Sequence, residues 1–314
     1  MKRVIMKISC LFLCLCSIFL AHAQTNKRTL VKEELFKEAK TLFVQKKYAA
    51  AKTTLDQFVQ VSQNASLLQE AEYMQAVANF KLKDENRVEV LTSYLDRYPD
   101  TPYENRVLAL MASAYFYEGE YDKSLAMFNS TRLELLDREE RDELTYLKAI
   151  SYLNIGNMQD AAIWFETLKE TNSSYQEDAE YYLSYIRYKQ QRYDEALNSF
   201  ENLRSSKKYG KYVPYFIADI ALVKGDLVKA DREARSYLAS YPNQEYAADM
   251  HRILGEIAYL KEDFRTAIVE LEEYVKQTNT VSRNANYMLG IAYYQTAVYS
   301  KAAEQLGEVV GIQD

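Results

Sequence analysis

The side chains that most often carry out catalysis are scarce in this sequence. After residue 23 the chain has one histidine, His251, and no cysteine, because Cys10, Cys14 and Cys16 all lie earlier. Cys/His nucleophile pairs and ordinary zinc sites need more of these residues, and a serine triad would depend on His251 alone. The isolated glycines form no glycine-rich phosphate loop. We therefore predict that the protein is not an enzyme and has no catalytic residue, no metal site and no cofactor.

Tyrosine is the abundant side chain that could bind a ligand, with 28 copies in the sequence. Tyr181, Tyr185 and Tyr188 follow one another at i, i+4 and i+7, so a helix would present all three on one face. Tyrosine rings give a large contact area at low entropic cost and carry a hydroxyl group, which suits a peptide or a sugar. The alternative, that the tyrosines only pack within the fold, stays open at this point.

The elements that position these side chains recur every 34 to 37 residues. One position in each repeat holds a small residue, and we number repeats 1 to 8 by it: Ala39, Ala76, Ala112, Ala149, Ser184, Ala218, Gly255 and Gly290. A second recurring position follows twelve residues later: Ala51, Val88, Ser124, Ala161, Ala196, Ala230, Ala267 and Ala302. Apolar residues recur at helical spacing and prolines are few, so each repeat is predicted to be a hairpin of two helices, A and B.

The first residues have the pattern of a secretory signal peptide. Basic residues open the segment, an apolar core follows, and Ala21-His22-Ala23 is a cleavage motif. We expect residues 1–23 to be removed, which leaves residues 24–29 as a short tail and no transmembrane segment in the mature chain. Cleavage changes the formal net charge from −6 to −9, because the signal carries three basic residues and no acidic one. An acidic surface repels phosphate, so we predict no nucleic-acid partner.

The last two repeats carry the clearest motif. Repeat 7 reads LGEIAY at residues 254–259 and DFRTA at residues 263–267, and repeat 8 reads LGIAYY at residues 289–294 and YSKA at residues 299–302. With small residues where two helices approach closely, the chain resembles the tetratricopeptide repeat. The resemblance implies an all-α fold, a right-handed α-solenoid of about eight helical hairpins over residues 30–314. We expect this array to continue beyond the C-terminus.

A large side chain precedes the second small position by three residues in most repeats: Tyr48, Tyr121, Met158, Tyr193, Leu227, Phe264 and Tyr299. The exception is Glu85, which marks repeat 2 as the most degenerate. Tyr98-Pro99 and Tyr241-Pro242, each followed by a short polar turn, resemble hairpin junctions in bacterial envelope proteins such as outer-membrane assembly lipoproteins and periplasmic cell-division coordinators. This resemblance implies an exported chain in the periplasm or cell envelope of a bacterium.

In this family helix A lines the concave face, and the residues three before, one after and four after its small residue point into a groove. The aromatic residues that we predict to contact a partner there are Tyr73, Phe80, Tyr146, Tyr181, Tyr185, Tyr188, Tyr215, Tyr259, Tyr287 and Tyr294. The resemblance implies a non-catalytic scaffold that binds a protein or peptide of the cell envelope. The alternative is a surface or periplasmic glycan-binding protein that uses the same aromatic groove.

Overall fold

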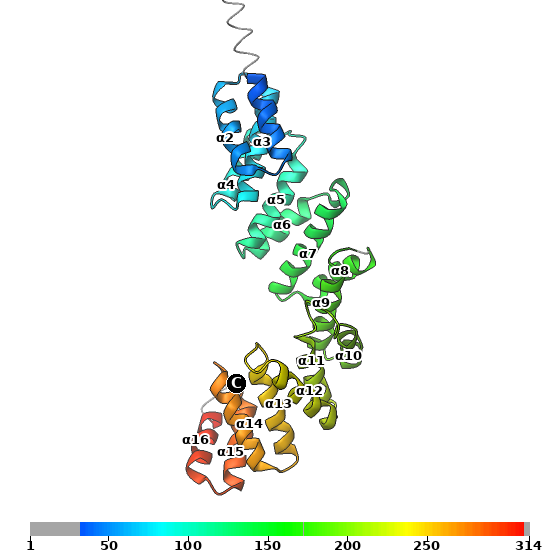
Figure 1. The fold of residues 1–314 in the computed structure, drawn as a ribbon, viewed down its shortest axis with the longest axis vertical. Helices are drawn as coiled ribbons and strands as arrows, with labels where there is room; N and C mark the ends of the chain where they lie inside the picture. The colour runs from blue at the N-terminus through cyan, green and yellow to red at the C-terminus, as the bar shows by residue number, and fades with distance from the viewer. Residues whose placement is uncertain (1–31, 172, 311–314) are drawn as a thin grey trace, which may run out of the picture. The chain divides into compact units, whose positions relative to one another are not determined.

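The computed structural model describes residues 32–171 and 173–310, and within these ranges every regular element is a helix and none is a strand. The first helix covers residues 32–44. The others are α2 (Tyr48–Val61), α3 (Ala65–Leu82), α4 (Arg87–Arg97), α5 (Glu104–Tyr117), α6 (Tyr121–Ser130), the short 3-10 helix η1 (Leu133–Leu135), α7 (Arg138–Asn154), α8 (Met158–Glu170), α9 (Gln176–Lys189), α10 (Tyr193–Asn202), α11 (Val213–Val223), α12 (Leu227–Ser240), α13 (Ala247–Leu260), α14 (Phe264–Gln277), α15 (Arg283–Gln295) and α16 (Tyr299–Val310). Figure 1 shows their order along the chain. The all-α prediction is confirmed.

These helices form eight successive hairpins in the part of the chain that the structure describes. The chain divides into two compact units, one up to Ala161 (unit 1) and one from Ala162 on (unit 2). Within each unit a helix packs against the next one along the chain, and α3, α5 and α7, like α11, α13 and α15, also contact one another in turn. The predicted signal peptide (1–23) and tail (24–29) lie outside the described residues and stay predictions.

The small positions of the repeat are the points where helices A and B of a hairpin cross. All eight helix-A positions are buried, and seven of the eight helix-B positions are too. In repeat 3 the Ser124 hydroxyl even donates a hydrogen bond to the carbonyl oxygen of Ala112, at 2.7 Å. A Cβ atom added to Gly255 would lie 2.6 Å from Cγ of Leu271 on the partner helix. Close approach of the two backbones therefore explains why these positions hold small residues.

One residue in each turn between helices A and B adopts a left-handed backbone, and it always follows the helix-A small residue by seven. These residues are Lys46, Lys83, Gly119, Gly156, Gln191, Gly225, Glu262 and Ala297. Helix B then begins two residues later, at the large side chain that the sequence pattern singled out, in seven repeats. Repeat 2 differs, because α4 begins at Arg87 rather than at Glu85. Its helix-B position, Val88, is accordingly only half-buried.

Pairs of stacked tyrosines join adjacent repeats. Tyr73 of α3 stacks on Tyr103 with ring centres 4.0 Å apart and planes 5° from parallel. The same arrangement joins Tyr181 to Tyr209 (4.1 Å) and Tyr215 to Tyr246 (4.3 Å). In each pair one tyrosine lies three residues before a helix-A small residue, and the other lies nine residues before the small residue of the next repeat. These contacts bury large ring surfaces between successive hairpins.

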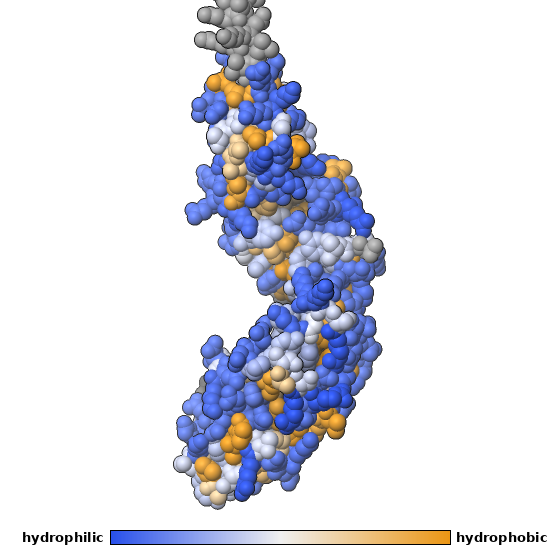
Figure 2. Space-filling view, viewed as in Figure 1, coloured by the Kyte–Doolittle hydropathy of each residue, from blue (hydrophilic) through white to orange (hydrophobic). Residues whose placement is uncertain are grey.

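The surface is mostly polar. Figure 2 shows hydrophilic residues over most of the visible face, with hydrophobic residues in small separate patches. Within residues 32–171 and 173–310, no helix combines the length and the apolar character that crossing a membrane requires.

Candidate functional site

The predicted groove positions lie on one surface of each unit, which we call the helix-A face. It consists of the residues three before, one after and four after each small residue of helix A. In unit 1 this face carries Tyr73, Phe80 and Tyr146, and in unit 2 it carries the other seven predicted residues.

In unit 1 the helix-A face is hollowed between α3, α5 and α7. Tyr73 and Phe80 line a pocket there whose remaining walls are Val77, Lys81, Arg106, Ala109, Leu110, Ser113, Leu136, Glu140, Glu143 and Leu144. A second pocket of about 470 Å³ shares Phe80, Lys81 and Glu143 with the first. Because of these shared walls, the two pockets form one groove with an apolar floor and charged edges, which we call the unit 1 groove.

The second pocket of this groove is rich in cations. Besides Phe80, Lys81 and Glu143 it is lined by Lys83, Arg87 and Tyr117. The Lys81 ammonium lies 5.6 Å from the centre of the Phe80 ring, and the Tyr117 side chain is 58% exposed. The Arg87 guanidinium forms an ion pair with Glu118 at 3.1 Å. The pocket therefore has three cationic side chains and one carboxylate, on a chain whose net charge is negative.

Tyr73 and Tyr146 are less available than the sequence alone suggests. One face of the Tyr73 ring is covered by Tyr103, and burial raises the pKa of its phenol, although Arg106 opposes this shift. Tyr146 packs against the hydrophobic cluster around Phe128 and Leu144. Phe80 is half-buried and lines both pockets of the groove. Of the predicted residues in unit 1, Tyr73 and Phe80 thus line the groove, while Tyr146 lies outside the residues that line it.

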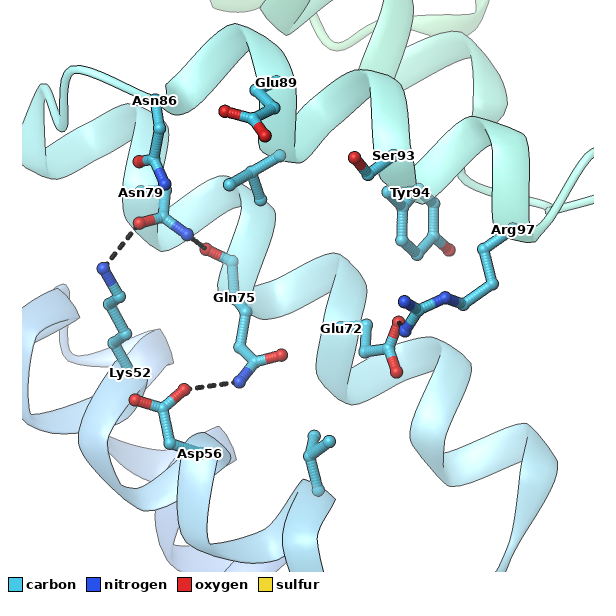
Figure 3. A pocket seen from close by; sticks show the side chains of 12 residues that line it. Lys52, Asp56, Glu72, Gln75, Asn79, Asn86, Glu89, Ser93, Tyr94 and Arg97 are labelled. Carbon is cyan, nitrogen blue, oxygen red and sulfur yellow. Dashed lines mark hydrogen bonds and ion pairs between the residues drawn. The ribbon is translucent and has the colours of Figure 1, made fainter.

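A different pocket lies on another side of α3, between α2 and α4 (Figure 3). Its volume is about 330 Å³, and most of the residues that line it carry a polar or charged group. Many of these polar groups bind each other: Lys52 donates to the Asn79 amide oxygen at 2.6 Å, and Gln75 donates to Asp56 at 2.6 Å. Sequence reasoning did not find this pocket. The one signal was the departure of repeat 2 from the pattern, since α4 forms one of its walls.

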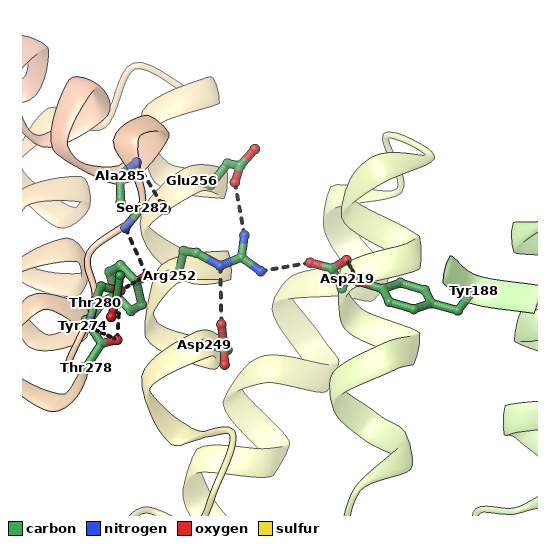
Figure 4. Close-up of polar contacts among 10 residues, drawn as sticks. All are labelled: Tyr188, Asp219, Asp249, Arg252, Glu256, Tyr274, Thr278, Thr280, Ser282 and Ala285. Atoms are coloured by element: carbon green, nitrogen blue, oxygen red, sulfur yellow. Dashed lines mark hydrogen bonds and ion pairs between the residues drawn. The ribbon is translucent and has the colours of Figure 1, made fainter. Parts of the chain in front are cut away.

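In unit 2 the helix-A face carries a network of charged and aromatic side chains (Figure 4). Asp219 of α11 accepts hydrogen bonds from the Tyr188 hydroxyl of α9 at 2.7 Å and from the Arg252 guanidinium of α13 at 2.8 Å. Arg252 also lies 3.5 Å from both Asp249 and Glu256 on its own helix. Three carboxylates therefore share one guanidinium, and Tyr188 contributes a neutral donor.

Tyr181, Tyr185 and Tyr188 pack within the fold on one side, where all three contact Phe216 of α11 edge to face. Each is half-buried. Burial raises the pKa of Tyr181 to about 12, and burial together with the hydrogen bond to Asp219 raises the pKa of Tyr188. Both phenols stay protonated at neutral pH, which leaves the Tyr188 hydroxyl as a donor to Asp219.

The other predicted residues of unit 2 differ in exposure. Tyr215 is half-buried beneath Tyr246, and burial raises its pKa to about 12. Tyr259 is half-buried and contacts Phe264 edge to face. Tyr287 and Tyr294 are 45% and 57% exposed and lie at i and i+7 on α15, so both project from one side of that helix. They are the predicted residues with the most ring surface free of the fold.

The sequence analysis did not identify the tyrosines that stack on Tyr73, Tyr181 and Tyr215. Tyr103, Tyr209 and Tyr246 come from the junctions between hairpins, and helical periodicity does not describe the path of such junctions. The available signal was a tyrosine nine residues before the small residue of repeats 3, 5, 6 and 7. The link from Asp219 to Arg252 had no comparable signal. No group of three or more His, Cys, Asp or Glu side chains within the described ranges could hold a metal ion.

Parts of the chain match known sequence families. Residues 110–177 and residues 178–206 match two sequence families, each described as tetratricopeptide repeat. No curated protein sequence matches the chain. The chain is also similar to solved structures at low sequence identity, and three of them are described here. A tetratricopeptide repeat protein from Parabacteroides merdae is 17% identical, with a TM-score of 0.48, over 83% of this chain and 98% of that one.

The other two structures are more similar in shape. The apo form of RapI is 12% identical with a TM-score of 0.59, over 88% of this chain and 87% of that one. PilF of Pseudomonas aeruginosa is 14% identical with a TM-score of 0.51, over 72% of this chain and 98% of that one. At sequence identities this low, the similarity shows a shared fold alone.

Proposed function

Because the chain carries tetratricopeptide repeats, we propose that it is a non-catalytic scaffold whose helix-A face binds a segment of a partner protein. Proteins with this fold generally serve protein–protein interaction. The observation that carries the proposal is the unit 1 groove, which is hollow at the positions that the repeat pattern assigns to ligand contact. Its apolar floor and charged edges suit a polypeptide segment, since apolar side chains can bury against the floor while polar groups meet the rim.

A glycan is less well supported as the ligand. Sugars bind to tyrosine mainly through an open ring face, but Tyr73, Tyr181 and Tyr215 each have one face stacked on another tyrosine. Tyr287 and Tyr294 keep more exposed ring surface, and they would serve a peptide equally well. Protein binding is therefore the function that the geometry supports best.

We further propose that the protein acts outside the cytoplasm, in the periplasm or cell envelope of a bacterium. The support is the segment of residues 1–23, with its basic start, apolar core and Ala21-His22-Ala23 motif. The partner would then be a protein of the same compartment.

Site-specific photo-crosslinking tests the scaffold proposal. A benzophenone amino acid replaces Tyr117 in the unit 1 groove, or Tyr294 on the helix-A face of unit 2, in cells of the source organism. Both sites are exposed and aromatic, so the substitution preserves the fold. We expect discrete adducts with a polypeptide from these positions after irradiation, detected by their mass on a gel and by mass spectrometry.

The control position is Val228 of α12, whose side chain is 75% exposed and lies on a helix B. We expect no adduct there. Equal adducts at all three positions, or none at Tyr117 and Tyr294, would contradict the proposal. An adduct that contains sugar but no peptide would favour glycan binding instead.

A further inference from the structure

The second pocket of the unit 1 groove has a charge pattern that specifies its ligand more closely. Lys81, Lys83 and Arg87 surround it, and only Arg87 has a carboxylate partner, Glu118. Lys81 and Lys83 are exposed, and neither forms an ion pair with any residue in the described ranges. Glu143 is the one carboxylate among the residues that line this pocket, so three cationic side chains face one anionic side chain there.

The cations of this pocket belong to an acidic chain. The full chain has a net charge of −6, and several of its lysines and arginines pair with carboxylates of an adjacent helix, as Lys40 does with Glu70 and Arg97 with Glu72. In the same pocket the Nε atom of Arg87 is buried and has no hydrogen-bond partner within the described part of the chain. When Glu143 and Glu118, the partner of Arg87, are counted against the three cations, this pocket keeps an excess positive charge of one on an acidic molecule.

The floor next to this pocket is apolar. Val77, Phe80, Ala109, Leu110, Leu136 and Leu144 line the adjoining pocket, which shares Phe80 and Lys81 with the cationic one. A ligand that fills both pockets must therefore place an anionic group beside the lysines and an apolar group on the floor. A polypeptide with an acidic residue near a large apolar residue meets both conditions.

We propose that the unit 1 groove binds an acidic, partly apolar segment of a partner protein, with its carboxylates held by Lys81 and Lys83 and its apolar side chain on Phe80 and the adjoining floor. This inference rests on the proposed function and specifies the partner's chemistry. A second copy of this chain and a small free anion are the competing occupants that the test must exclude.

The test begins with a random twelve-residue peptide library displayed on phage and selected against the purified protein. We expect selected peptides to be enriched in Asp or Glu next to Leu, Phe or another large apolar residue. A selected peptide is then labelled with fluorescein, and its affinity for the protein is measured by fluorescence anisotropy at low and high salt. Binding should weaken as salt increases, because the lysines are exposed and screened.

The decisive variant is K81E/K83E, which we expect to weaken binding of this peptide by about tenfold or more. Its matched control is K46E/K189E, which makes the same charge change at the same two repeat positions elsewhere. Lys46 is the left-handed turn residue of repeat 1, as Lys83 is of repeat 2, with φ of 58° and 59°. Lys189 follows its small residue by five, as Lys81 does. The control should bind within about twofold of the wild type, and far-UV circular dichroism checks both folds.

Several outcomes would overturn the inference. The selected peptides could lack any enrichment in Asp or Glu. The two double variants could lose the same amount of peptide affinity, or K81E/K83E could lose none. Displacement of the peptide by inorganic phosphate at peptide-like concentrations would indicate a small-anion site. A dimer mass in light scattering that K81E/K83E abolishes would indicate self-association. If peptides bind but ignore Lys81 and Lys83, only this inference fails. If photo-crosslinking at Tyr117 and Tyr294 also yields nothing, the proposed function fails with it.

Discussion

Burial raises the pKa of two carboxyl groups on α13, those of Asp249 and Glu256, and Arg252 only partly offsets this effect. Both side chains lie 3.5 Å from the Arg252 guanidinium, which already binds Asp219 at 2.8 Å. At neutral pH the folded protein therefore keeps two carboxylates charged in a place where their charge is unfavourable. Such strain is tolerated in binding sites more often than in scaffolding contacts.

Glu256→Gln should stabilise the protein at pH 7. A carboxyl group whose pKa is raised in the folded state contributes most to the free energy of unfolding at a pH below its ordinary pKa of 4.5. That contribution is lost as the pH rises through the higher pKa of the folded state. Glutamine stays uncharged at every pH and so avoids this loss. We therefore expect the free energy of unfolding to increase by about 0.5 kcal/mol at pH 7, after allowing for partial exposure, and the increase to disappear near pH 4. Urea unfolding at the two pH values measures it.

Glu272→Gln is the control with the opposite sign. Hydrogen bonds from Tyr293 and Lys301 lower the pKa of Glu272, so its contribution is present above 4.5 and is lost as the pH falls. This variant should lose stability at pH 7 and approach the wild type in acid. A loss of stability in Glu256→Gln at pH 7 would show that its ion pair with Arg252 outweighs its desolvation.

At the scale of elements, the stacked tyrosines are the contacts that repeat. Tyr73 and Tyr103 lie on successive hairpins of unit 1, and their planes are nearly parallel at 4.0 Å. Replacing each by leucine keeps apolar volume but removes the ring–ring interaction. A double-mutant cycle should therefore give a coupling free energy of about 0.5–1.5 kcal/mol between them.

The control cycle pairs Tyr103 with Tyr117. These residues lie at opposite ends of α5, fourteen residues apart, which is about 21 Å along a helix. Their coupling should be near zero. Equal coupling in both cycles would mean that the leucine substitutions act through the stability of α5 rather than through the stack.

The sequence predicted the hairpins well because steric contact at the helix crossings dictates residue size. Ala39, Ala76 and Gly255 are small because a neighbouring helix leaves no room, and this constraint is visible without a structure. The same pattern located the first residue of helix B in seven repeats. The left-handed turn residues were not predictable by type, since Lys46 and Gln191 adopt the conformation that Gly119 adopts more easily.

The candidate site was predicted less completely, for a physical reason. Helical periodicity predicts on which face of a helix a side chain lies, and Tyr73 and Phe80, which it assigns to one face, both line the unit 1 groove. Periodicity does not predict which side chains of the segments between hairpins cover that face, as Tyr246 covers Tyr215. It also does not reveal electropositive ends such as that formed by Lys81 and Lys83, because these residues belong to a helix end and a turn.

At the scale of the whole molecule, residues 1–23 carry the proposal of export. When the full chain is produced in a Gram-negative bacterium, we expect the protein in the periplasmic fraction with Gln24 as its first residue. Mass spectrometry of the intact protein and N-terminal sequencing measure this. Large residues at both small positions, Ala21→Leu with Ala23→Leu, should block cleavage and leave a heavier, membrane-retained product. An uncut wild-type protein in the cytoplasmic fraction would contradict the proposal.

One carboxylate also has a consequence for how unit 2 comes apart. In repeat arrays the free energy is close to a sum of single-repeat and nearest-neighbour contributions, which permits the ends to fray one repeat at a time. Asp219 binds Tyr188 of the preceding hairpin and Arg252 of the following one, so repeats 5, 6 and 7 share a single buried acceptor. Fraying should therefore halt at this block, whose three hairpins melt together as one cooperative segment.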